Sequence, residues 1–192
     1  MTVQYTENFK KLSVEAQNSI KSYTEKSVMD ETWYKLQTEQ NRSLIFCSDK
    51  HNLVLKVMIG KGKSDKDIES LTALSESDYF PNLYAFEERE FLIMDKALGK
   101  DLSDIKWVIS EDELEKVKLN LYNALSDMLD VNRYDWDFKE EHIFWDIENS
   151  KLTWIDLGIC DPAVISTKAD KERKIQSFYR SKPTLKPISN SI

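Results

Sequence analysis

The chain has 192 residues, of which 41% are apolar and 32% are charged, a composition typical of a folded globular protein rather than a disordered one. Its formal net charge of −7 argues against general nucleic-acid binding. The sequence has no run of 18 apolar residues and begins without an apolar signal segment, so we expect no membrane span and a cytoplasmic location. The two cysteines, Cys47 and Cys160, are too few for a disulfide framework, which also favours a reducing compartment.

Glycine is scarce in this chain, at four residues, and a protein rich in tight turns needs more, so we expect long helices. An amphipathic helix is predicted over 6–28, because apolar residues recur there at spacings of three and four. Short β-like runs follow at 32–36, 43–47 and 52–59, and the last of these is the most apolar. A second helix is expected to begin at Ser64, a residue type that caps helix N-termini well.

The second half of the chain is expected to contain a hairpin, a long helix, two more short strands and a terminal helix. In chain order these segments are 83–86 paired with 90–94, the helix from residue 110, 143–145, 152–155 and 164–181. Ser110 and Glu113 form a capping box, which marks the start of the long helix. This order of helices and strands indicates an α+β fold.

Lys56 interrupts the most apolar predicted strand, and on alternation it shares a strand face with Val54 and Met58. A lysine in this setting has two interpretations. It can lie at a sheet edge with its ammonium group extended to water, or it can be held in a cleft to meet an anion. The second interpretation predicts a carboxylate partner on the following helix. Glu69 lies there, although a helical glutamate is often only a solvated charge.

Four polar residues cluster around the two short strands of the second half. Asp137, Lys139 and His142 precede the first of these strands, and Asp156 stands before Leu157 and Gly158 at the end of the second. An aspartate at a strand end is a common metal ligand, and it is also a common turn residue. No one of these residues identifies a chemistry, but their order and spacing together carry much more weight.

The ordered set of motifs resembles a eukaryotic-like (Hanks-type) Ser/Thr protein kinase domain. The matching segments are NLVLKV at 52–57, the helix at 67–74, the strand regions 79–88 and 91–97, the D-x-K-x-x-N-like segment 137–142 and the D-F-G-like segment 156–158. The resemblance predicts a minimal bilobal fold, with an antiparallel sheet and one helix in the N-lobe and a reduced helical C-lobe. It divides the chain into an N-terminal helical extension at 1–30, an N-lobe with the hinge at 31–97, and a reduced C-lobe with a basic C-terminal helix at 98–192.

The resemblance implies roles for five residues of the N-lobe. Lys56 would hold the α- and β-phosphates of ATP, and Glu69 would form an ion pair that orients Lys56. Met94 falls at the gatekeeper position before the adenine-binding hinge. Asp95 and Ala97 would offer hinge backbone groups to the adenine ring.

In the C-lobe the resemblance implies a catalytic pair and a metal site. Asp137 would accept the proton of the substrate hydroxyl, and Lys139 would stabilise the transferring phosphoryl group. Asp156 would bind Mg²⁺ or Mn²⁺. His142 stands where the family has a metal-binding Asn, and because imidazole is a softer ligand than a carbonyl oxygen, this predicts a preference for Mn²⁺.

Several features depart from the family pattern. Gln37, Glu39 and Arg42 take the places of the three glycines in the phosphate-binding loop. Trp136 stands where the family has the arginine that binds an activation-loop phosphate. Only residues 159–192 follow the D-F-G-like motif, with no A-P-E segment, so most of the large helical subdomain is expected to be absent.

The sequence therefore leaves two main functions open. The first is an active kinase that transfers phosphate from ATP to Ser or Thr of a protein substrate, favoured by the full set of candidate residues and by a lysine two positions after Asp137. The second is a pseudokinase, a nucleotide-binding or protein-interaction module, favoured by the missing glycines and by His142. A small-molecule phosphotransferase is a further alternative. A protein substrate or binding partner is expected, and the helix at 6–28 either packs on the N-lobe or docks a partner.

Overall fold

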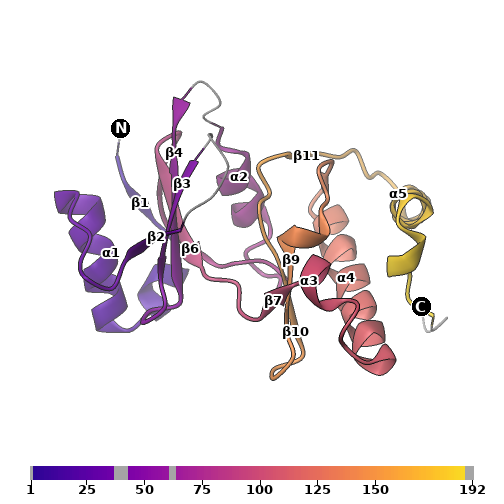
Figure 1. The fold of residues 1–192 in the computed structure, drawn as a ribbon. Coiled ribbons are helices and arrows are strands. Elements are labelled where there is room, and N and C mark those ends of the chain that lie inside the picture. Colours follow the sequence, from indigo (N-terminus) through magenta and orange to yellow (C-terminus); the bar gives the residue numbers. More distant parts are fainter. Residues whose placement is uncertain (1, 37–42, 61–63, 189–192) are drawn as a thin grey trace. The chain divides into compact units, whose positions relative to one another are not determined.

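The structure is a computed structural model, and it describes residues 2–36, 43–60 and 64–188 (Figure 1). The chain divides into two compact units, which we call unit 1 (residues 1–75 and 81–97) and unit 2 (residues 76–80 and 98–192). Within the described ranges, no helix is long and apolar enough to cross a membrane.

Unit 1 is built on a six-stranded antiparallel sheet with the strand order β1-β5-β6-β4-β3-β2. The strands are β1 (Gln4–Tyr5), β2 (Tyr34–Leu36), β3 (Ser43–Ser48), β4 (Leu53–Met58), β5 (Leu83–Glu87) and β6 (Phe91–Asp95). Strand β1 was not expected, because two residues are too few to show an alternating pattern. Gln37, Glu39 and Arg42, the positions expected to replace the three glycines, lie outside the described residues.

One face of this sheet is covered by two helical segments, η1 (Asn8–Lys11) and α1 (Val14–Lys26) (Figure 1). A single helix had been expected here, but Ser13 divides it. Its backbone is extended, with ψ of 155°, and its side chain accepts a hydrogen bond of 3.2 Å from the N–H three residues on. Ile20 of α1 is fully buried in one cluster with apolar side chains of β4 and β6. The helical segment therefore packs on the sheet and forms part of the core of unit 1.

The other face of the sheet carries α2 (Lys66–Ala73) (Figure 1). Alternation along β4 explains the arrangement, because Leu53 and Leu55 pack on the α1 side while Lys56 contacts α2. The helix begins one residue later than expected, with Asp65 as its N-cap residue, and the Ser64 hydroxyl accepts a hydrogen bond of 3.2 Å from the second N–H after it.

Unit 2 combines helices with two small antiparallel sheets, of strand order β10-β9-β7 and β11-β8. Its elements are β7 (Lys100–Asp101), α3 (Leu102–Ile105), α4 (Glu111–Asp130), β8 (Arg133–Asp135), η3 (Glu140–His142), β9 (Ile143–Asp146), β10 (Lys151–Trp154), β11 (Cys160–Pro162), α5 (Lys168–Ser181) and η4 (Pro183–Leu185). The long helix, the β9–β10 hairpin and the terminal helix were expected. Strands β7, β8 and β11 were not.

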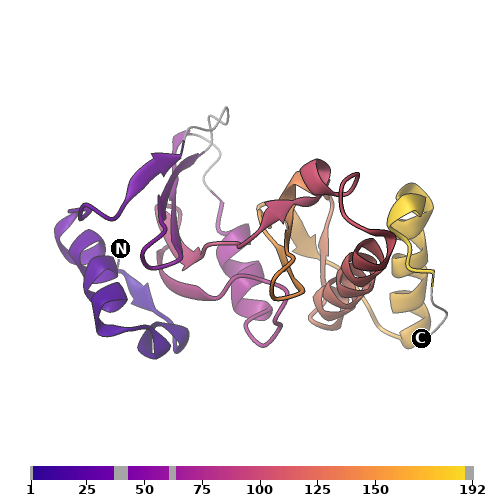
Figure 2. The ribbon, with the colours of Figure 1, turned by 60° about the horizontal axis from the view of Figure 1, so that its bottom comes forward.

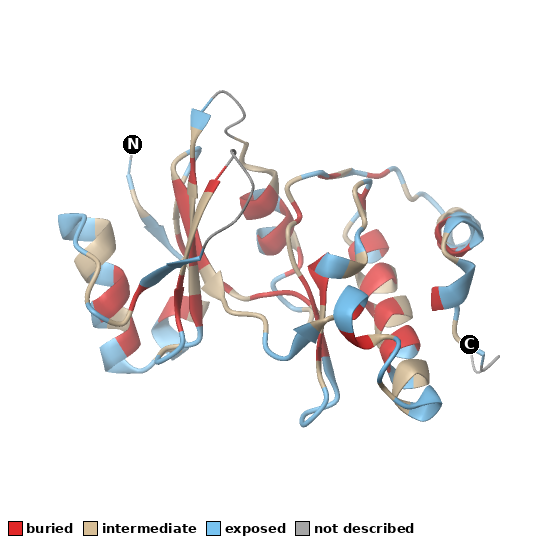
Figure 3. Ribbon diagram, viewed as in Figure 1, coloured by how far each residue is buried: buried red, intermediate tan, exposed pale blue. Residues whose placement is uncertain are grey.

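The long helix α4 forms the centre of unit 2. It begins as predicted, since the Ser110 side chain accepts a hydrogen bond of 3.2 Å from the Glu113 N–H. One face of α4 is buried, including Val117, Leu121 and Met128, and Figure 3 shows buried residues on successive turns of this helix. Helix α5 packs beside α4, and Figure 2 shows the pair from a second direction. Both units thus combine helices with antiparallel strands, which confirms the α+β class.

A single glycine fixes the entry of the chain into unit 2. Gly99 has φ of +84°, and a Cβ atom at this position would lie 2.0 Å from the backbone oxygen of Trp145. No other residue fits there, since both the left-handed backbone and the close approach of β9 exclude a side chain. Gly99 therefore brings the segment before β7 against the β9–β10 hairpin, and the candidate site residues lie just before and just after this hairpin.

Candidate active site

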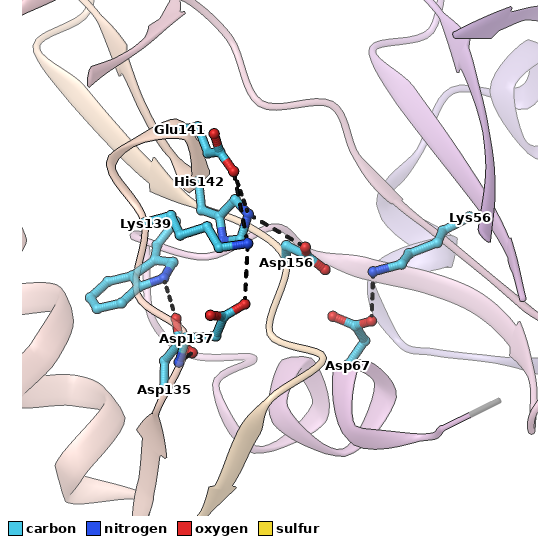
Figure 4. A network of polar contacts seen from close by, with 9 residues as sticks. Lys56, Asp67, Asp135, Asp137, Lys139, Glu141, His142 and Asp156 are labelled. Carbon is cyan, nitrogen blue, oxygen red and sulfur yellow. Dashed lines mark hydrogen bonds and ion pairs between the residues drawn. The ribbon is translucent and has the colours of Figure 1, made fainter. Parts of the chain in front are cut away.

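In unit 1, Lys56 forms an ion pair with Asp67 of α2, with Nζ 2.9 Å from Oδ2 (Figure 4). Both side chains are largely buried, at 15% and 10% exposed. Strand β4 lies between β3 and β6, so Lys56 is in the interior of the sheet, and the interpretation as an edge lysine is wrong. A buried ammonium group that a carboxylate holds in place is suited to bind an anionic ligand.

The sequence had placed the partner of Lys56 at Glu69, and the structure shows an ion pair of Lys56 with Asp67. Residues that are two positions apart in a helix differ by about 200° around the helix axis, so Asp67 and Glu69 face different directions. Asp67 shares the buried face with Leu71, whereas Glu69 is exposed. The sequence did contain the signal, because Asp67 lies four residues before Leu71 and therefore on the apolar stripe of the helix.

Strand β6 contains Met94 and Asp95, and Ala97 lies two residues beyond its end. Met94 lies near the end of β6 and is half-buried. The Asp95 N–H donates a hydrogen bond of 3.0 Å to the carbonyl of Asn82, so this N–H is already engaged within unit 1. The Asp95 carboxylate accepts bonds from the Asn82 N–H and side-chain amide, at 3.0 and 2.7 Å, and from the Tyr84 hydroxyl. Ala97 follows at the end of the unit and is half-buried.

Burial raises the pKa of the Tyr84 phenol, and its hydrogen bond to Asp95 raises it further. The phenol therefore stays protonated and continues to donate to the Asp95 carboxylate. This contact fixes the Asp95 side chain within unit 1.

In unit 2, Asp137 and Lys139 lie together in the loop between β8 and β9 (Figure 4). Lys139 Nζ is 3.3 Å from Asp137 Oδ2, and the two side chains are 44% and 45% exposed. A catalytic carboxylate and a cation for a phosphoryl group must both be accessible to substrate, and both of these are. The structure thus brings together the two residues to which the sequence assigned catalysis.

Asp135 supports this loop from inside and was not singled out by the sequence. It is buried, and its two carboxylate oxygens accept hydrogen bonds from the Asp137 N–H at 2.8 Å and from the Trp154 indole N–H at 3.2 Å. Burial raises the pKa of the Asp135 carboxyl above its ordinary value, while these two donors act in the opposite direction. Asp135 therefore connects the backbone at Asp137 to strand β10, which leads to Asp156.

His142 and Asp156 lie side by side at the end of the β9–β10 hairpin (Figure 4). The distance from His142 Nε2 to Asp156 Oδ2 is 3.5 Å, and Nε2 is 3.8 Å from Glu141 Oε1. His142 is buried, and its Nδ1 has no hydrogen-bond partner among the residues that the structure describes. Asp156 has φ of +59°, a left-handed conformation that non-glycine residues adopt uncommonly.

These two residues offer few ligands for a metal ion by themselves. In the described part of the chain, no group of three or more His, Cys, Asp or Glu side chains is arranged to hold a metal ion. Mg²⁺ in nucleotide sites is usually held by one or two carboxylates, with water and phosphate oxygens completing the shell. The Asp156 carboxylate fits such a site, and the His142 imidazole is a nitrogen donor that Mn²⁺ accepts more readily than Mg²⁺.

A series of short contacts connects these residues within unit 2. Lys139 Nζ, which contacts Asp137, is also 3.9 Å from Glu141 Oε1, and Glu141 in turn approaches His142. His142 then approaches Asp156. The four residues predicted for the C-lobe therefore form one cluster of charged and polar side chains, with Glu141 as an additional member.

No protein-family model matches the chain, and no curated protein matches it. Among the solved structures, the chain is similar to the Cydia pomonella granulovirus kinase PK-1, with a TM-score of 0.58 and 20% sequence identity. The similarity covers 76% of this chain and 57% of the viral kinase, so the chain spans a little more than half the length of that protein. This similarity shows that the chain has a protein-kinase-like fold, with a sheet-based unit and a helical unit, as the sequence motifs predicted.

Proposed function

We propose that this protein transfers a phosphoryl group from ATP to a Ser or Thr hydroxyl of a protein substrate. The observation that carries the proposal is the accessible Asp137–Lys139 pair, which is connected through Glu141 and His142 to Asp156 in unit 2. The kinase-like fold supports it, and so does the buried Lys56 in unit 1.

Each residue would act by position and charge, because phosphoryl transfer needs little covalent chemistry from the protein. Asp137 accepts the proton of the attacking hydroxyl, and Lys139 stabilises the negative charge of the transferring phosphoryl group. Lys56 binds the phosphates of ATP, and Asp67 orients Lys56. The Asp95 carbonyl is left to bind the adenine amino group.

Asp156 and His142 would hold Mg²⁺ or Mn²⁺. The metal ion supplies charge neutralisation of the nucleotide phosphates when it is bound. The lysine two residues after Asp137 favours a protein hydroxyl over a small molecule, since this spacing is the one in the resembling protein kinase family.

A pseudokinase is the second candidate, and one observation favours it. The His142 imidazole lies 3.5 Å from the Asp156 carboxylate, so it can provide a polar neighbour for that carboxylate without a metal ion. Such a protein would keep nucleotide or partner binding without transfer. The two candidates thus differ in catalysis and not in fold.

The decisive experiment is phosphate transfer from γ-labelled ATP with Mg²⁺ or Mn²⁺, using the protein alone, with a generic protein acceptor and with a mixture of small hydroxyl compounds. We expect label in protein, and we expect Asp137→Asn to lower the rate about a thousandfold while the fold stays intact. The matched control is Asp78→Asn, an exposed carboxylate of unit 2 that should leave the rate unchanged.

The remaining outcomes assign the alternatives. Label in the small-molecule fraction alone would assign a small-molecule phosphotransferase. A saturable shift in melting temperature with ATP but no label in any fraction would assign the pseudokinase. Equal label incorporation by wild type and Asp137→Asn would refute the catalytic role of Asp137.

A further inference from the structure

The loop that carries Asp137 is bordered by aromatic side chains. Trp136 and Phe138 stand on either side of Asp137 in the sequence, and Tyr134 packs against Trp136 with ring centroids 4.7 Å apart. Phe138 packs edge-on against Trp154 at 5.2 Å. Trp136 is 58% exposed, which is high for the largest apolar side chain. Its position therefore depends on the few contacts that it makes.

Helix α5 supplies those contacts. Lys174 Nζ lies 4.5 Å from the Trp136 ring centroid and 4.9 Å from that of Tyr134, so one ammonium group meets two aromatic rings. Phe178, one helical turn further on, packs edge-on against Phe138 at 4.9 Å. Lys182, the C-cap residue of α5, places its Nζ 5.6 Å from the same Phe138 ring.

The three α5 residues lie on one face of the helix. Their spacing of four residues places them along one side, because residues four apart are neighbours on a helix surface. They touch the residue before Asp137 and the residue after it, while Asp135 holds the Asp137 N–H from the protein interior. The loop is thus held on both sides of Asp137, while the Asp137 side chain itself stays 45% exposed.

The helix itself is fixed to the rest of unit 2. Tyr179 stacks on Tyr122 of α4, with ring planes 8° apart, and Lys171 Nζ is 2.6 Å from Asp130 at the end of α4. The buried Ile175 adds apolar contact on the same helix. Because α5 is anchored on α4, its contacts hold the loop in a fixed position relative to α4.

We propose that α5 positions the catalytic loop and that Lys174 is its key positioning residue. This inference rests on the proposed function, since it states how Asp137 is held for phosphoryl transfer. The cation that orders the loop is the Lys174 ammonium group, which belongs to the same chain as the loop. Lys174 acts through Trp136 and Tyr134, without contact to the reacting atoms.

The test compares Lys174→Gln, which removes the cation at similar length, with Lys174→Arg, which keeps it. The matched control is Lys168→Gln on the same helix, whose side chain is 91% exposed. We expect Lys174→Gln to lower kcat about tenfold with KM for ATP unchanged, and Lys174→Arg to stay within about twofold of wild type. A purely structural role would instead lower the melting temperature and leave kcat of the folded fraction unchanged.

Amide hydrogen exchange of the peptide covering residues 134–142 provides a readout that needs no activity. Lys174→Gln should speed exchange of this peptide about tenfold, while Lys168→Gln should not. Unchanged exchange, or faster exchange with unchanged kcat, would overturn the positioning role. If the wild type has no transfer activity, the proposed function fails, and the exchange rates then decide by themselves whether α5 holds the loop.

Discussion

Each unit contains a lysine–carboxylate pair, and the two pairs differ in their contact with water. Lys56 and Asp67 of unit 1 are 15% and 10% exposed, whereas Lys139 and Asp137 of unit 2 are 44% and 45% exposed. A buried pair is held by its own geometry, and removal of one member leaves the other without compensation. An exposed pair contributes little to stability, so each of its side chains can leave the other and contact a substrate instead. Unit 1 thus holds a fixed cation, while unit 2 presents the accessible pair to which the proposed function assigns catalysis.

The largest expected effect on stability follows from removal of the buried Lys56, and removal of the exposed Lys139 is its counterpart in unit 2. We expect Lys56→Met to lower the free energy of unfolding by about 1–3 kcal/mol, because Asp67 stays buried without its partner. Lys139→Met should change it by less than about 0.5 kcal/mol. Urea unfolding of both variants provides the measurement.

A second variant tests the cause of that difference. Lys56→Met combined with Asp67→Leu should recover most of the lost stability, because an apolar pair of similar volume replaces a buried ion pair at little net change. If the double variant is as unstable as Lys56→Met alone, the loss comes from packing and not from the unpaired carboxylate. Equal effects of Lys56→Met and Lys139→Met would remove the contrast between the units.

The next effect concerns Asp135, the buried neighbour of the exposed Asp137. Both of its carboxylate oxygens accept hydrogen bonds, and an asparagine has only one oxygen to accept them. We therefore expect Asp135→Asn to destabilise the protein by about 1–2 kcal/mol, since one buried donor loses its acceptor. The exposed Asp78→Asn is the control and should have no measurable effect.

The Asp135 variant also has a pH dependence of known sign. Burial raises the pKa of this carboxyl in the folded protein above its ordinary value of 3.8. Its contribution to stability is therefore fully present below pH 3.8 and is lost as the pH rises through the raised folded-state pKa. The stability difference between wild type and Asp135→Asn should be larger below pH 3.8 than at neutral pH. A difference that grows with pH would contradict the raised pKa.

The sequence singled out the candidate residues that lie close together in the chain, but it missed two buried carboxylate partners. Asp137, Lys139 and His142 follow from short-range spacing, because they lie within one loop and its adjoining turn. The buried partners Asp67 and Asp135 were missed, since aspartate is rarely buried and nothing in the local sequence singled out either position. Their burial is decided by which face of α2 and which side of β8 meet the core.

The elements that escaped prediction depend on contacts between distant segments. Strand β8 forms because Asp135 pairs with Cys160 of β11. Strand β1 forms because Gln4 pairs with Phe86 of β5, which is far away in the sequence. Such two- and three-residue strands have no local pattern from which to predict them. Helix α4 was predicted well because 20 residues carry a long periodic pattern and a capping box.

A smaller effect is expected from His142, the buried member of the unit 2 cluster. If the imidazole binds the metal ion, wild type should prefer Mn²⁺ over Mg²⁺, and His142→Asn should shift the ratio of the two activities toward Mg²⁺ about fivefold. His51→Asn, a change at the other histidine of the chain, is the matched control. An unchanged metal preference in His142→Asn would refute the ligand role and leave His142 as a neighbour of Asp156 only.

The smallest expected effect is that of phosphatase treatment, which should change the transfer rate by less than about twofold. Activation by phosphorylation requires a basic residue that binds the new phosphate and thereby orders the catalytic loop. In this chain Trp136 occupies the loop position next to Asp137, and Lys174 contacts that ring in the unmodified protein. Dephosphorylated and mock-treated protein should therefore transfer phosphate at the same rate under matched metal and ATP concentrations. A large loss on dephosphorylation would show that another basic residue binds a phosphate, and that the contacts of α5 are insufficient to order the exposed pair of unit 2.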